Sequence, residues 1–136
     1  MDIKYEHFKK AAKEIGSHGD NDTLPFDIDN KFISDKHAEI AELAFEFYER
    51  LEKTGVGQAK QILDSLSIFH ERLLTPSGTC GFRITTKIHP FWNVYINGLA
   101  IGLAERLEPM RSVRAHSYRH STEENRLFLR EHSWYS

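Results

Sequence analysis

Hydrophobic and polar positions follow a helical period through most of the first half of the chain. Apolar side chains recur every three to four residues over 3–15, a run that Gly16 ends, and again over 35–53 and 56–66. The inward positions of the second run are Ile40, Leu43, Ala44, Phe47 and Leu51. Residues 1–66 are therefore predicted to form a helical N-terminal region.

The pattern changes to a period of two in the second half. Residues 81–88 are rich in β-branched and aromatic side chains, and a Pro-Ser-Gly turn precedes them, which is typical of a β-hairpin. One face of this arm carries Phe82 and Ile84, whereas Arg83 and Lys87 lie on the other face. We expect the apolar face to hold the core and the two cations to project from an open face.

A long apolar run follows the hairpin over 91–107. Pro90 suits the first turn of a helix, because that position needs no amide hydrogen, and Pro109 ends the run. The apolar stripe of this run consists of Trp92, Tyr95, Ile96, Leu99, Leu103 and Leu107. The predicted fold class is therefore α+β: a mostly helical N-terminal region, then a small antiparallel β-hairpin and a central buried helix within 67–136.

Length and composition restrict the kind of protein. A chain of 136 residues with 40% hydrophobic residues is long enough for one domain with its own core. The single cysteine, Cys80, excludes an intramolecular disulfide and a cysteine-based zinc site, which fits a reducing compartment. No secretory signal is visible, and the most apolar run contains Asn, Glu and Arg, so we expect a cytoplasmic protein without a membrane span.

The net charge of −2 hides an asymmetry along the chain. Residues 1–69 carry nine Lys and Arg against fourteen Asp and Glu, whereas residues 70–136 carry nine against six, and eight of the nine arginines. Arginine presents a planar fork that suits phosphate, so the second part is the candidate for contact with polyanions. The same cations could instead pair with the acidic first half, and the sequence leaves both interpretations open. The candidate groups for triphosphate oxygens or a nucleic-acid backbone are Arg83, Lys87, Arg111, Arg114 and Arg119.

Patterns for other chemistries are weaker. The polar loop over 17–30 holds four aspartates, but it lacks the glycine and glutamate of an EF-hand, so a solvated or helix-capping loop is expected. His116 and His120 are four residues apart without a third ligand, so no metal site is predicted. No catalytic residue is assigned either, because Cys80 has no partner pattern for a nucleophile.

Two alternative functions remain open at this point. The stretches "RSVRAH" and "RAHSYRH" match the loose Arg-x4–6-His pattern of HEPN-type ribonucleases, in which His116 or His120 would act on RNA. A β-hairpin conflicts with the all-helical bundle of that family. The other alternative is a non-catalytic module that binds RNA or protein.

Four short motifs, in order, resemble those of a known family. They are "HGDNDTLPF" (18–26), "GFR" (81–83), "HPFWN" (89–93) and "HSYR" (116–119), with "RLEP" at 106–109. This order resembles the fingers region of bacterial, defence-associated reverse transcriptases of the unknown-group classes. The resemblance covers most of the chain. It implies the N-terminal and fingers portion, truncated before the palm, of an RNA-directed DNA polymerase with an antiphage role.

The resemblance also implies roles for the basic residues. Arg83 and Lys87 would contact the triphosphate of an incoming nucleotide. The second basic segment would contact nucleic acid, with Arg119 holding the fingers against the palm or the template. The residues of that segment are Arg111, Arg114, His116 and Arg119.

The chain departs from the family at the catalytic centre. Polymerase chemistry in this family uses two metal ions held by palm aspartates, and no aspartate follows Asp64 here. We therefore expect no cofactor in this chain, which would be inactive alone, and Mg²⁺ in the intact enzyme. The implied partners of that enzyme are a dNTP, an RNA template and a DNA product. An apolar face that the palm should cover would allow self-association.

Overall fold

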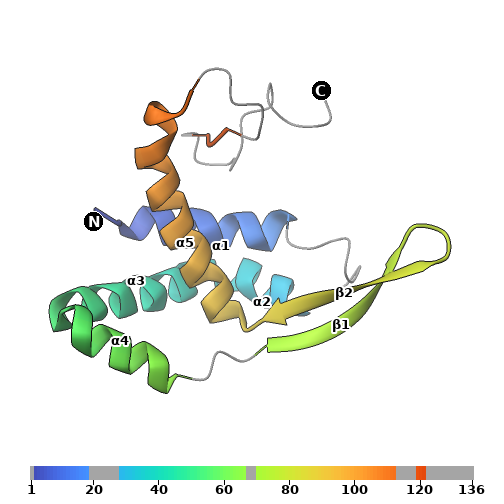
Figure 1. Ribbon diagram of the computed structural model, residues 1–136, viewed down its shortest axis with the longest axis horizontal. Helices are drawn as coiled ribbons and strands as arrows, with labels where there is room; N and C mark the ends of the chain where they lie inside the picture. Colours follow the sequence, from blue (N-terminus) through green and yellow to red (C-terminus); the bar gives the residue numbers. More distant parts are fainter. Residues whose placement is uncertain (1, 19–27, 67–69, 113–118, 122–136) are drawn as a thin grey trace.

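The structure is a computed structural model that describes residues 2–18, 28–66, 70–112 and 119–121. Its elements, in chain order, are α1 (Tyr5–His18), α2 (Ile28–Asp35), α3 (His37–Thr54), α4 (Val56–Ser65), β1 (His70–Ser77), β2 (Gly81–Ile88), α5 (Pro90–Leu107) and the short 3-10 helix η1 (Glu108–Met110). The helices gather into one body, and the two strands form a hairpin that projects from it (Figure 1). This arrangement confirms the predicted α+β fold with a helical front and an antiparallel hairpin.

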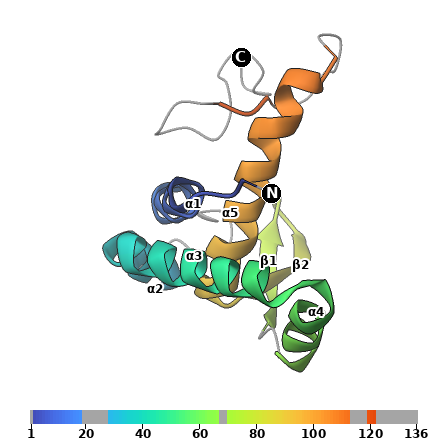
Figure 2. The ribbon, with the colours of Figure 1, turned by 90° about the vertical axis from the view of Figure 1, so that its left-hand side faces the viewer.

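The core lies where α1, α3 and α5 meet. Phe8 of α1 is fully buried, and its ring centroid lies 5.9 Å from Tyr95 of α5 and 6.2 Å from Tyr48 of α3. The backbone of α5 approaches α1 closely at Gly98, where a Cβ atom would overlap the Phe8 ring. Figure 2 shows α5 beside α1, with α3 below α1 and in front of the first part of α5. The predicted central helix is thus present, and small residues let it pack against α1.

The start of α5 agrees with the sequence prediction. His89 precedes the helix with extended backbone, and its ring Nδ1 accepts a hydrogen bond from the backbone amide of Phe91 at 3.2 Å. Pro90 occupies the first helical position, where its missing amide hydrogen has no cost. The "HP" pair therefore fixes the point at which the β2 strand turns into the helix.

The two strands pair in antiparallel register. Leu74 lies opposite Ile84 and Thr75 lies opposite Arg83, and the turn between the strands contains Gly78 at a φ of +66°. That positive φ is a conformation that glycine adopts without steric cost. Side chains alternate along a strand, so Arg83 and Lys87 lie on one face of the hairpin, and Phe82 and Ile84 lie on the other with Leu74. This is the division of faces that the sequence predicted.

The prediction of which hairpin face holds the core is wrong. Leu74, Phe82 and Ile84 are 73%, 74% and 69% exposed, whereas Thr75, on the face of Arg83, is only 2% exposed. Alternation determines which residues share a face, but it does not determine which of the two faces is covered in the folded protein. The apolar face of the hairpin is the open one in this structure.

The inward stripes predicted for two helices also need correction. Leu43 of α3 is 57% exposed, and Ala41 and Tyr48 are buried in its place. In α5 the exposed positions include Ile96, Leu103 and Leu107. The buried positions of α5 are Val94, Tyr95, Gly98, Ile101 and Gly102. Most of α5 is apolar, so hydrophobic spacing alone could not select the face that meets α1.

Two boundaries near the N-terminus differ from the sequence prediction. The helix α1 does not end at Gly16 but continues to His18, and Gly16 is the point where α1 approaches Ser34 of α2. Part of the predicted polar loop, residues 28–30, belongs to α2 instead. None of the described helices combines the length and the hydrophobicity that a membrane crossing requires.

Candidate functional site

Arg83 stands on the covered face of the hairpin but is itself exposed. Its Nε atom lies 3.4 Å from Oγ1 of Thr75, and the same hydroxyl donates to the backbone carbonyl of Arg83, also at 3.4 Å. Thr75 therefore steadies the base of the arginine side chain. A guanidinium has five N–H donors in a planar fork that suits phosphate, and Thr75 engages the donor at Nε.

Lys87, the second predicted phosphate contact, is engaged within the protein. Its Nζ atom lies 2.7 Å from Oδ2 of Asp29 in α2, and the two side chains are 29% and 37% exposed. This ion pair joins the base of the hairpin to the helical body. For Lys87, the alternative that the cations of the second part pair with acidic residues of the first half is therefore correct.

The second basic segment gathers around one carboxylate, that of Glu108 at the end of α5. Arg119 donates from Nη1 to Oε1 of Glu108 at 3.0 Å and from Nη2 to the carbonyl of Ser112 at 2.8 Å. Arg111 lies 3.5 Å from Oε2 of the same carboxylate, and the backbone amide of His120 donates to that oxygen at 3.2 Å. Glu108 therefore holds the segment that carries residues 119–121 against the end of α5.

The charge of Glu108 is stabilised by these neighbours. The backbone hydrogen bond from His120 is the main reason that the pKa of Glu108 lies below its usual value. Arg111 and Arg119 lower the pKa further, whereas partial burial opposes the shift. Arg119, with only 15% of its side chain exposed, therefore joins residues 119–121 to Glu108 and Ser112.

The two basic segments do not form one row among the described residues. The hairpin precedes α5 and the 108–111 segment follows it, and this 18-residue helix is about 27 Å long. Figures 1 and 2 show the hairpin and η1 well apart. Arg111 and Arg119 therefore do not lie next to Arg83, because α5 separates them, and these candidate phosphate contacts do not form one site. Arg114 and His116 lie outside the described residues.

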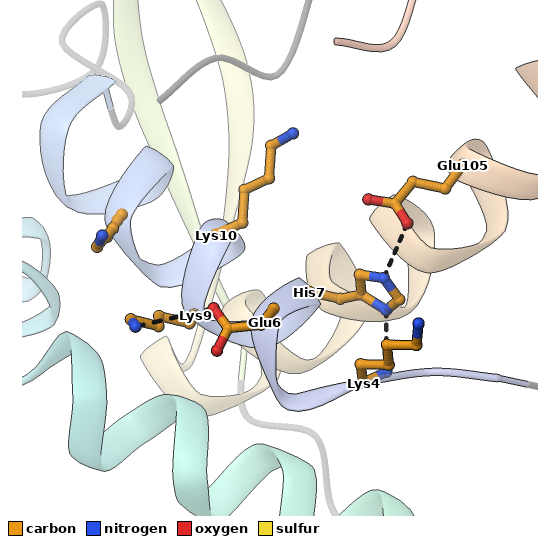
Figure 3. Close-up of a pocket in the computed structure, with 7 residues that line it drawn as sticks. Lys4, Glu6, His7, Lys9, Lys10 and Glu105 are labelled. Carbon is orange, nitrogen blue, oxygen red and sulfur yellow. Dashed lines mark hydrogen bonds and ion pairs between the residues drawn. The ribbon is translucent and has the colours of Figure 1, made fainter. Parts of the chain in front are cut away.

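A pocket that the sequence did not predict lies between α1 and the C-terminal part of α5. It has a volume of about 300 Å³, and its floor includes the ring of His7, only 6% of which is exposed (Figure 3). Its lining residues are Lys4, Glu6, His7, Lys9, Lys10, Lys13 and Glu105. Four lysines and two glutamates therefore line this pocket, so its lining is basic.

His7 is held in one orientation by two hydrogen bonds. Its Nδ1 accepts from the backbone amide of Lys4 at 3.0 Å, and its Nε2 lies 3.0 Å from Oε2 of Glu105 (Figure 3). Because Nδ1 is an acceptor, the ring hydrogen is on Nε2 and points at the carboxylate. The pocket floor is therefore a fixed imidazole and not a flexible side chain.

His120 lies on the other side of Glu105. Its Nε2 is 4.0 Å from Oε1 of that carboxylate, too far for a hydrogen bond, and is buried without a partner among the described residues. Burial is the main reason that the pKa of His120 is lowered; Lys10 and His7 add to the effect, and Glu105 and Glu108 oppose it. His120 belongs to a non-helical segment, unlike the helical Arg–His pair of the ribonuclease alternative.

No protein-family model, curated protein or solved structure matches this chain. The residues that the structure describes contain no group of three His, Cys, Asp or Glu side chains able to hold a metal ion.

Proposed function

We propose that the chain is the N-terminal and fingers portion of a bacterial, defence-type reverse transcriptase, which works in the cytoplasm as an RNA-directed DNA polymerase. Its part in that enzyme is to contact the incoming nucleotide and the template. The observation that carries the proposal is the exposed Arg83 on a β-hairpin that projects from the helical body and leads directly into α5. The order of the sequence motifs supports the same assignment.

Arg83 has the chemistry for the nucleotide contact. A guanidinium binds phosphate oxygens with two parallel hydrogen bonds, and a strand holds it more rigidly than a loop would. Thr75 supports the side chain at its Nε atom, on the side away from the terminal nitrogens. In this proposal Arg83 therefore provides the main phosphate contact of the hairpin.

The other basic residues have smaller parts in the proposal. Lys87 would reach a triphosphate only by leaving Asp29, so its contribution is secondary to that of Arg83. Arg119 would act chiefly by positioning residues 119–121, because Glu108 and the carbonyl of Ser112 occupy its guanidinium. Arg111 shares that carboxylate.

A second candidate function rests on the open face of the hairpin. Leu74, Phe82 and Ile84 form an exposed apolar patch, which monomeric proteins usually avoid unless the patch is a contact surface. This patch favours a protein-binding module, or association of two copies of the chain through their hairpins. In the reverse transcriptase proposal the same face would be covered by the palm.

Sequencing the DNA that follows codon 136 tests the proposal at low cost. We expect an open frame that encodes a Phe-x-x-x-Asp strand and an x-x-Asp-Asp turn, and RNA-templated DNA synthesis by the protein it encodes. A stop codon at that point, with no DNA synthesis by the chain, would contradict the proposal and favour the binding module.

A further inference from the structure

The basic pocket on α1 is not used by the proposed function, and its construction points to a ligand. Helical spacing places Glu6, Lys9, Lys10 and Lys13 on one side of α1, while Phe8 and its neighbours on the opposite side enter the core. The lysines therefore do not contribute to the core. They concentrate positive charge around a pocket whose floor is the fixed ring of His7.

Two of the lysines at the pocket form long ion pairs. Lys9, with 31% of its side chain exposed, lies 3.7 Å from Glu6, and Lys4, 65% exposed, lies 3.7 Å from Asp2. Exposed pairs of this kind contribute about 0–1 kcal/mol and exchange partners readily. Lys10 is held differently, since its Nζ donates to the carbonyl of Ser121 at 2.6 Å. That bond fixes one ammonium at the rim.

The lining of the pocket suits a phosphate group. It carries four ammonium groups and two carboxylates, and lysine ammonium groups bind phosphate oxygens as point charges. A volume of about 300 Å³ is at the lower end of the range for small-ligand pockets and is large enough for a phosphate with its sugar. Lysines act as mobile point charges toward phosphate, so they can adapt to a ligand of this size.

We propose that the pocket between α1 and α5 binds the phosphate of a nucleotide or of a single nucleic-acid strand. Lys9, Lys10 and Lys13 supply the charge, and His7, held by Glu105, forms the floor. Glu6 limits the affinity, because its carboxylate competes with the ligand for Lys9. This site is on a different element from Arg83, so its failure would leave the proposed function standing.

Titration calorimetry of the 136-residue chain tests the site with two probes, inorganic pyrophosphate and a 12-nucleotide single-stranded RNA. We expect the double variant Lys9→Gln with Lys13→Gln to bind the probe at least tenfold more weakly. The matched control is Lys31→Gln with Lys53→Gln, which removes the same charge from α2 and α3 at side chains that are 74% and 76% exposed. We expect the control to change affinity less than twofold.

A variant that should bind the probe more tightly provides a second test. Glu6→Gln removes the competing carboxylate, and we expect it to strengthen binding two- to fourfold. Its control is Glu49→Gln, which removes the partner of Lys53 in a comparable exposed pair at 3.5 Å and should have no effect.

Each outcome of these titrations has a definite meaning. Binding of pyrophosphate with the expected variant pattern identifies the phosphate of a free nucleotide as the ligand, and binding of RNA alone identifies a strand backbone. The proposal is overturned if neither probe binds, or if the control pair of lysines weakens binding as much as the pocket pair does. Unchanged circular dichroism of every variant ensures that lost binding is not lost folding.

Discussion

The burial of His120 should make the stability of the folded protein depend on pH. The residue is 8% exposed, and among its titratable neighbours Lys10 and His7 lower its pKa, whereas Glu105 and Glu108 raise it. Burial dominates this balance and lowers the pKa of His120. The folded protein therefore keeps this ring neutral at pH values where the unfolded chain would bind a proton.

A pH series of urea unfolding measures this effect. A histidine whose pKa is lowered by folding stabilises the protein fully above its unfolded pKa of about 6.5 and loses that contribution as the pH falls below it. We expect wild type to lose more unfolding free energy between pH 7 and pH 5 than His120→Gln, which cannot be protonated. Equal losses in the two proteins would contradict this account of His120.

The sequence could predict some of the site residues but not their partners. Strand alternation correctly placed Arg83 and Lys87 on one face of the hairpin. It could not indicate that Asp29 pairs with Lys87, because Asp29 lies far away in the sequence, in a helix that was not predicted. His7 gave no signal either, since a histidine at a helical position is usually a residue of the core.

Among the elements, α1 and α5 pack through glycines, and this contact can be tested by adding one methyl group. Gly98→Ala would place a Cβ against the Phe8 ring, so we expect a loss of about 1–3 kcal/mol of unfolding free energy. The matched control is Gly57→Ala in α4, where no atom lies within 4 Å. There the better helix propensity of alanine should add up to about 1 kcal/mol.

Denaturant unfolding of both variants gives the comparison. A neutral or stabilising Gly98→Ala would mean that α5 does not approach α1 as closely as the structure shows, whatever the result for Gly57→Ala.

The accuracy of the sequence prediction differed between elements for physical reasons. The helix α5 was placed correctly because His89 and Pro90 mark its start and a long apolar run defines its body. The helix α2 was missed because its eight residues carry too few apolar positions to show a period. The continuation of α1 beyond Gly16 was missed because glycine usually marks the end of a helix, and the local sequence does not show that Gly16 packs against Ser34 of α2.

The whole molecule is a helical body with a projecting hairpin, and the open face of that hairpin predicts its behaviour in solution. We expect the chain to self-associate as its concentration rises, because Leu74, Phe82 and Ile84 would be removed from water. Sedimentation velocity should show that Leu74→Thr with Ile84→Thr remains monomeric, since threonine keeps the strand preference and removes apolar surface. Val56→Thr, at an exposed position of α4, is the control and should behave as wild type.

A monomeric wild type at all concentrations would contradict this prediction. The sequence indicated the apolar face itself but placed it against the core. The reason is that apolar and polar residues alternate along the strands in the same way, whether the helical body or another protein covers the apolar face.

The most direct test of the central claim is the nucleotide dependence of RNA-templated DNA synthesis by the protein that the complete reading frame encodes. We expect Arg83→Ala to raise the KM for dNTP at least tenfold, because a phosphate contact of the hairpin is lost. Arg72→Ala, an exposed arginine on the opposite face of the same hairpin, should change it less than twofold. Equal KM values for Arg83→Ala and wild type, or no DNA synthesis by the wild-type protein, would contradict the account.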